Sequence, residues 1–144
     1  MTRPVPPDRT AFRQFEQLQT RWADNDIYGH MNNAYHYQLF DTAVNGYLLR
    51  HGIINLTDSP CVFLVVSSGC DYFAELRFPD IIHAGIHVTR LGSSAVHYGI
   101  GLFKNDDLAA AAFGTFVHVN VDRKTKKPTP ISPFARDTLM ALHI

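Results

Sequence analysis

The chain has 144 residues, 46% of them hydrophobic, with thirteen basic side chains, thirteen acidic side chains and eight histidines. That length is typical of one domain with a complete hydrophobic core, and the composition lies far from that of disordered chains. The formal net charge of zero excludes the broad basic surface of a nucleic-acid binder or of a protein that reads anionic membranes. Any anion-binding site must therefore be local.

Cysteine content and hydropathy indicate the cellular compartment in which we expect the protein. Cys61 and Cys70 are the only cysteines, too few for a disulfide framework and without the CxxC spacing of zinc sites. No apolar stretch approaches the roughly 18 residues of a membrane span, and the start of the chain is polar and rich in proline. We expect a cytoplasmic protein with one domain over residues 1–144, in which residues 1–12 form a flexible arm.

The first predicted element is a short strand that begins near Gln14 and ends near Trp22. A cluster of polar and turn-forming residues, DNDIYGHMNN, follows it over positions 24–33. Such a cluster between a strand and an apolar periodic segment predicts a loop that leads into a helix.

A helix over residues 34–51 is the best-defined element. Its apolar side chains recur at helical spacing, with polar side chains on the other faces. Asn32 or Asn33 suits the N-cap, and Gly52 suits the left-handed position after the last turn.

The chain after residue 60 has the composition of β-strands. β-branched and aromatic residues dominate, and turn residues separate the segments. The predicted strands cover residues 61–76, 85–92, 94–103 and 111–122. The second and third form a hairpin that turns at Leu91-Gly92-Ser93-Ser94. A tail over residues 124–144 follows, with room for a short helix.

The last predicted strand alternates between valines and polar residues. We expect its valines to be buried and its polar residues to face solvent; these are Val117, Val119 and Val121 against His118, Asn120 and Asp122. Strands separated by short turns predict an antiparallel sheet, and the apolar stripe of the helix needs a sheet face to cover it. The predicted fold class is α+β, an antiparallel sheet packed on one long helix.

Two carboxylates, Asp24 and Asp26, precede the predicted helix. A purely structural explanation is that the unpaired amides and the dipole of a helix start favour acidic residues. The catalytic explanation is that a carboxylate beside such amides drives acyl transfer, because the amides stabilise the negative charge that develops on the carbonyl oxygen. The sequence has neither a GxSxG elbow nor a cysteine with a histidine at a recognised spacing.

The run WADNDIYGHMNNAYHYQLFD resembles the opening of the 4-hydroxybenzoyl-CoA thioesterase family, in which a DxDxxG segment precedes the central helix. The segments VVSSGCDYFAELRFPD, HVTRLGSSAVHYGIGLF and GTFVHVNVDRKTKKPTPI are similar to the successive strands of that family, so the resemblance spans residues 14–133. It implies a hotdog fold, in which an antiparallel sheet wraps one long helix and subunits pair as a homodimer or homotetramer. It also implies hydrolysis of an acyl-CoA, or of an acyl-carrier-protein thioester, without a metal or organic cofactor.

Carried over by position, the resemblance makes Asp26 the nucleophile or general base and the backbone amide of Asn33 the donor to the thioester carbonyl. Asp41 is a second candidate, because another hotdog lineage places its carboxylate within the helix. Ile27 and Tyr28 replace the Pro-Ala of the aromatic-acyl branch, and GHMNN is more similar to fatty-acyl thioesterases. The acyl group therefore stays open.

Several residues have both a binding and a structural interpretation. The candidate substrate-binding residues are Tyr28, Gly29, His30, Asn32, Ser68, Arg90, Ser93 and Ser94. Among the histidines, only His30 lies close enough in sequence to Asp26 to act with it, although a histidine beside a helix cap is commonly structural. His83 and His87 lack a third ligand at suitable spacing, so no metal site is expected.

The anionic phosphates of CoA have two candidate binding segments. Arg90 with Ser93 and Ser94 is one, and the basic run over 123–127 is the other, although a solvated turn explains that run more simply.

Two functions from different classes remain open. The primary interpretation is an acyl-CoA thioesterase, and the alternative is a protein that holds an acyl thioester or a lipid-like ligand without hydrolysing it. A dehydratase of the same superfamily is disfavoured because its histidine motif is not evident. The expected partners are an acyl thioester and further copies of this chain, with neither nucleic acid nor membrane.

Overall fold

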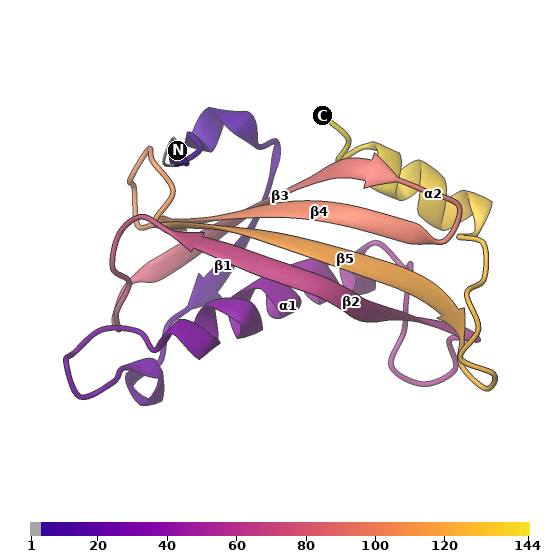
Figure 1. The fold of residues 1–144 in the computed structure, drawn as a ribbon, viewed down its shortest axis with the longest axis horizontal. Helices are drawn as coiled ribbons and strands as arrows, with labels where there is room; N and C mark the ends of the chain where they lie inside the picture. The colour runs from indigo at the N-terminus through magenta and orange to yellow at the C-terminus, as the bar shows by residue number, and fades with distance from the viewer. Residues whose placement is uncertain (1–3) are drawn as a thin grey trace.

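A computed structural model describes residues 4–144 and shows a five-stranded antiparallel sheet packed against one long helix (Figure 1). The strands are β1 (Gln14–Gln19), β2 (Cys61–Tyr72), β3 (Ile81–Leu91), β4 (Ala95–Lys104) and β5 (Ala112–Asp122). The helices are α1 (Asn33–Arg50), α2 (Pro133–Met140) and two short 3₁₀ segments, η1 (Arg9–Ala11) and η2 (Trp22–Asp24). The order in the sheet is β1-β3-β4-β5-β2, so β1 and β2 form its edges. The predicted α+β class is confirmed.

Local capping determines where α1 begins and ends. The Oδ1 atom of Asn32 accepts a hydrogen bond from the amide of Ala34 at 3.0 Å, which makes Asn32 the N-cap. Gly52 follows the C-cap with φ of +72°, a left-handed conformation that glycine adopts without a steric penalty. The helix prediction is confirmed to within one residue at each end.

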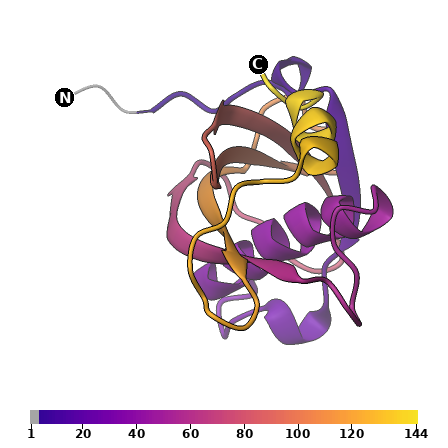
Figure 2. The same ribbon diagram turned by 90° about the vertical axis from the view of Figure 1, so that its right-hand side faces the viewer.

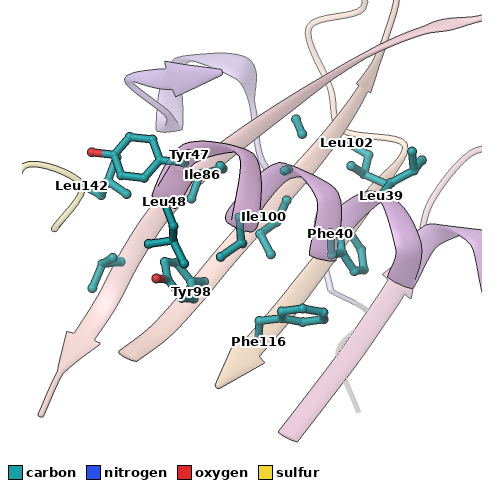
Figure 3. Packing of buried hydrophobic residues seen from close by; sticks show 14 of the residues in the cluster. Leu39, Phe40, Tyr47, Leu48, Ile86, Tyr98, Ile100, Leu102, Phe116 and Leu142 are labelled. Carbon is teal, nitrogen blue, oxygen red and sulfur yellow. The ribbon is translucent and has the colours of Figure 1, made fainter. Parts of the chain in front are cut away.

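The core lies between α1 and the concave face of the sheet, which curls around the helix when viewed end-on (Figure 2). Phe40 and Leu48 of α1 are fully buried; Phe40 packs over Phe116 of β5, and Leu48 lies over Tyr98 of β4 (Figure 3). The helix approaches closely at Gly114, where a Cβ atom would lie 2.4 Å from the Phe40 ring. Each large side chain buried here stabilises the fold by about 1.5–3 kcal/mol.

The prediction for β5 holds at its end, where Val121 is 4% exposed and Asp122 is not buried, but it is wrong for the four residues before them. His118 is 1% exposed, and its ring packs among Phe63, Tyr98 and Phe116, whereas Val117 and Val119 are half-buried on the opposite face. Asn120 also points inward, where its Nδ2 atom donates to the carbonyl of Thr129 at 3.0 Å. An imidazole that stacks on aromatic rings and an amide with a backbone acceptor can both be buried, so the polar residues of an alternating strand need not face water.

Burial of His118 makes stability depend on pH. Desolvation lowers the pKa of His118 from its usual value of 6.5 to about 4. The unfolded chain therefore binds a proton between these values that the folded chain excludes, and stability is lost as pH falls from 6.5 toward 4, by about 3 kcal/mol. In urea unfolding at pH 7 and pH 4.5, we expect His118→Phe to lose less stability than the wild type. His51→Ala, at the exposed end of α1, should keep the wild-type pH dependence.

The second half of the predicted flexible arm is held against the outer face of the sheet. The carbonyl of Pro7 accepts from the amide of Ala110 at 2.9 Å, and the guanidinium of Arg9 donates to the carbonyls of Asn105 and Asp107. Phe12 is buried beside Phe103. Residues 7–12 are therefore part of the packed structure.

Three strand boundaries differ from the prediction by more than one residue. β1 ends at Gln19, three residues early, because the Thr20 hydroxyl donates to the carbonyl of Asp80 at 2.6 Å and the chain turns away. β3 begins at Ile81, where it pairs with Gln19 of β1. β2 ends at Tyr72, since the next two amides both donate to the carbonyl of Ala111.

The strands run the length of the molecule, so the loops that join them lie at two opposite ends. The loop before α1 and the β2–β3 connection lie at one end, and the β3–β4 hairpin and the turn after β5 lie at the other (Figure 1). A strand of eleven residues, such as β3, spans roughly 35 Å. In residues 4–144 no helix is both long and apolar enough to cross a bilayer.

Candidate active site

Asp24 has a structural role in the loop before α1. It is 4% exposed, and its carboxylate accepts from the Arg21 side chain at 2.6 and 3.0 Å and from the Arg21 amide at 3.1 Å. Its carbonyl accepts from the amide of Asn32 at 2.9 Å, which ties the loop to the helix cap. The first carboxylate of the DxD pair is therefore structural, although it pairs with Arg21 at the start of η2 and not with the amides of α1.

Asp26 is held in a tight turn by hydrogen bonds to one of its two carboxylate oxygens. Its Oδ1 atom accepts from the amides of Tyr28 at 2.8 Å and His30 at 3.3 Å. Gly29 completes the turn with φ of +81°, and its amide donates to the Asp26 carbonyl at 3.1 Å. No donor within residues 4–144 bonds to Oδ2 of Asp26. That oxygen is therefore free to act on a ligand.

A hollow of about 340 Å³ at the N-terminus of α1, which we name the inner hollow, brings the two predicted catalytic groups together. Its lining comprises Asp26, His30, Met31, Asn33, His36, Tyr72, Phe73, Ala74, Glu75 and Leu76. The amides of Ala34 and Tyr35 both bond to Asn32, whereas the Asn33 amide has no acceptor in the described part of the chain. A free amide at a positive helix end is suited to bind a developing oxyanion.

Three residues of the inner hollow with polar or charged side chains, His36, Tyr72 and Glu75, were not predicted as site residues. His36 is 3% exposed, and its ring packs edge-to-face on Tyr72 with centroids 4.8 Å apart. Burial lowers the pKa of His36, so the imidazole is neutral at pH 7. The Nε2 atom of His30 lies 2.8 Å from Oε2 of Glu75. Helical spacing from Asn33 could have identified His36, but no local signal pairs His30 with a residue 45 positions later.

Cys70 lies next to Tyr72 on β2 and is not a competing nucleophile. Burial raises the pKa of the Cys70 thiol to about 11 and that of the Tyr72 hydroxyl to about 12. Both groups stay protonated at neutral pH, and a thiol is a far weaker nucleophile than a thiolate.

Other predicted site residues lie outside the inner hollow. Tyr28 is 76% exposed and contributes its amide rather than its ring. Ser68 lies near the middle of β2, paired with Phe116. Asp41 is exposed on α1 and accepts from the Asn45 side chain at 3.0 Å.

The residues predicted to contact the CoA phosphates lie far from Asp26 in the fold. Arg90, Ser93, Ser94 and the basic run over 123–127 lie at the end of the sheet opposite Asp26, about a strand length away. Arg136 of α2 donates to the carbonyls of Gly92 and Ser93, which holds that hairpin turn in place. One chain therefore does not bring these residues to its own Asp26.

Comparison with known proteins identifies the family. The profile of the thioesterase-like superfamily matches residues 20–139, which include the Asp26 turn, α1 and all of the sheet except β1. The chain belongs to the thioesterase-like superfamily. Membership supports thioester hydrolysis as the general class of reaction.

Individual relatives agree with this placement. The crystal structure of the PA5185 protein from Pseudomonas aeruginosa PAO1 is 46% identical, with a TM-score of 0.93 and 97% of each chain covered. A 1,4-dihydroxy-2-naphthoyl-CoA thioesterase from Synechocystis has a TM-score of 0.79 at 16% identity, covering 89% of this chain and 96% of its own. The uncharacterized protein YsmA of Bacillus subtilis is 23% identical over 134 residues, 92% of this chain and 88% of YsmA. The predicted hotdog fold of this superfamily is confirmed.

Proposed function

We propose that the protein is an acyl-CoA thioesterase in which Asp26 drives cleavage of the thioester C–S bond. The observation that carries this proposal is the inner hollow, where a carboxylate with a free oxygen and a free helix-start amide share one cavity. The Asn33 amide would bind the carbonyl oxygen while Asp26 acts on the carbonyl carbon. This arrangement needs neither a serine nor a cysteine nucleophile.

Two routes use the same residues. In the nucleophilic route, Oδ2 of Asp26 bonds to the carbonyl carbon, the C–S bond breaks with its electron pair leaving on the CoA thiolate, and water hydrolyses the mixed anhydride. In the general-base route, Asp26 takes a proton from water, the water oxygen forms the new C–O bond, the C–S bond breaks with its electron pair leaving on sulfur, and Asp26 returns the proton to the departing thiolate. Both routes yield a carboxylic acid and free CoA.

The sequence and the structural relatives point to more than one class of thioester substrate. The DxDxxG segment supports a relationship to the 4-hydroxybenzoyl-CoA thioesterase branch. The Synechocystis relative is named for an aromatic substrate, 1,4-dihydroxy-2-naphthoyl-CoA. The GHMNN run is more similar to fatty-acyl enzymes, and an acyl-carrier-protein thioester stays an alternative substrate. A panel of substrates must decide among these.

Thiol release is the direct test. We expect acyl-CoAs of varied chain length and aromaticity, incubated with the protein and a thiol reporter, to release CoA above the uncatalysed rate. Tight binding of the same compounds without any release would identify a non-hydrolytic binding protein instead.

We also propose that β2 pairs with its counterpart in a second copy, as the resemblance implies. β2 is an edge strand of twelve residues, and Leu64, Val65 and Val66 near its centre are exposed. Long apolar edge strands promote aggregation when they are left unpaired. In an antiparallel pair the Cys61 end of one β2 lies beside the Tyr72 end of the other. Such a pairing would bring the 123–127 run of the second copy, which adjoins the Cys61 end of its β2, toward the inner hollow.

Val66→Lys tests this interface. Val66 is 60% exposed within the irregularity between Val65 and Ser67, so the substitution removes little internal packing. A charge on the paired edge should convert a dimer or tetramer into a smaller species in size-exclusion chromatography with light scattering. Leu56→Lys, in an exposed loop, is the matched control and should leave the mass unchanged. A mass unaffected by Val66→Lys would place the subunit contact elsewhere.

A further inference from the structure

A second hollow, which we name the outer hollow, opens on the other side of Asp26. It has a volume of about 870 Å³ and lies between the loop before α1 and the connection from β2 to β3. Its lining consists of Trp22, Asn25, Asp26, Ile27, Gly29, Arg77, Phe78 and Pro79. Because Asp26 lines both hollows, a ligand whose reacting carbon lies at Asp26 can extend one arm into each.

The walls of the outer hollow are fastened to each other. The Oδ1 atom of Asn25 accepts from the amide of Phe78 at 3.1 Å, which joins the two loops directly. The amide of Arg77 donates to Oδ2 of Asp80 at 3.0 Å and fixes the turn that carries its side chain. The hollow is thus built before any ligand arrives.

Aromatic rings and a free cation line this hollow at the surface. Trp22 is 76% exposed and Phe78 is 37% exposed, and their rings meet edge-to-face with centroids 6.3 Å apart. Adjacent exposed aromatics mark binding surfaces more often than chance allows. Arg77 is exposed, and among the described residues its guanidinium has no ion-pair partner.

The two hollows differ in charge. The inner hollow has two carboxylates, Asp26 and Glu75, which repel phosphate. The outer hollow has the Arg77 guanidinium, which pairs with phosphate oxygens, next to a flat indole on which a purine can stack. An acyl-CoA thioester has one apolar arm and one arm that ends in an adenine nucleotide.

We propose that the outer hollow binds the adenine nucleotide arm of CoA, with Trp22 stacking on the base and Arg77 pairing with phosphate. The identity of this ligand rests on the proposed function. The acyl arm then occupies the inner hollow, and the thioester carbon lies between the hollows at Asp26.

Trp22 makes this proposal directly measurable, because it is the only tryptophan in the chain. Titration with free CoA, and separately with adenosine 3′,5′-bisphosphate, should change its fluorescence saturably without any turnover. Arg77→Ala keeps the fluorophore and should raise Kd for both compounds roughly tenfold, with Arg77→Lys intermediate. Phe134→Ala removes an exposed ring from α2 and should leave Kd unchanged.

The outcomes separate this proposal from the thioesterase assignment. A saturable change without thiol release from any acyl-CoA would support the nucleotide site and refute the hydrolase. Thiol release with no fluorescence response to CoA would keep the hydrolase and overturn the nucleotide site. A response to an acyl-N-acetylcysteamine thioester, but not to the bisphosphate, would assign the outer hollow to the acyl arm. If Arg90→Ala raises the Kd for CoA and Arg77→Ala does not, the phosphates bind at Arg90 of a second copy. This result and the preceding one each refute the proposal.

Discussion

Asp26→Asn is expected to lower kcat for the best acyl-CoA by about 10²–10⁴-fold. The amide oxygen of asparagine can still accept from the Tyr28 and His30 amides, so the turn is retained. What is lost is the anionic oxygen that attacks the thioester or takes a proton from water. Steady-state thiol release, together with an unchanged melting temperature, would attribute the loss to chemistry.

Asp41→Asn is the matched control for the Asp26 substitution. Asp41 is an exposed carboxylate on α1 outside both hollows, and the amide oxygen that replaces it can still accept from Asn45. We expect near wild-type turnover in this variant. The reverse result, with Asp41→Asn inactive and Asp26→Asn active, would place the protein in the lineage that has its carboxylate within the helix.

Asn33→Pro is expected to lower kcat by about 10²–10³-fold, because it removes the amide that would bind the oxyanion. Proline is well tolerated at the first position of a helix, and the fold already has one at the start of α2. Asn32 has φ of −61° and ψ of 137°, a conformation compatible with a following proline. The helix should therefore survive while a single donor is lost.

Asn33→Ala separates the backbone donor from the side chain. This variant loses the carboxamide but keeps the N–H, and we expect its kcat to exceed that of Asn33→Pro by at least about tenfold. Equal activity of the two variants in the thiol-release assay, at equal thermal stability, would show that the Asn33 amide does not act in the reaction.

Sequence reasoning identified the features that neighbouring residues determine. The start and end of α1 follow from Asn32 and Gly52, whose effects act within one turn of the helix. The turn around Asp26 is equally local, since its hydrogen bonds join residues at most four positions apart. Such features are encoded in a short run of residues and can be read from it.

Features that depend on contacts across the sheet could not be predicted in this way. The inward direction of His118 depends on Phe63 and Tyr98, which come from two other strands. The pairing of His30 with Glu75, and the joining of Asn25 to Phe78, require the β2–β3 connection to return to the loop before α1. Period-two alternation alone does not determine which face of a strand is buried.

The hydrogen bonding of the Asp26 turn has a consequence for how the protein can change over evolution. Residues 21–34 hold their own shape through the Arg21–Asp24 and Asp26–His30 contacts and the Asn32 cap. The side chains of Trp22, Ile27 and Phe78 take no part in those hydrogen bonds. In the proposed thioesterase, substitutions at these wall positions would alter which thioesters are accepted while the Asp26 turn keeps its geometry, so new substrate preferences would arise one mutation at a time.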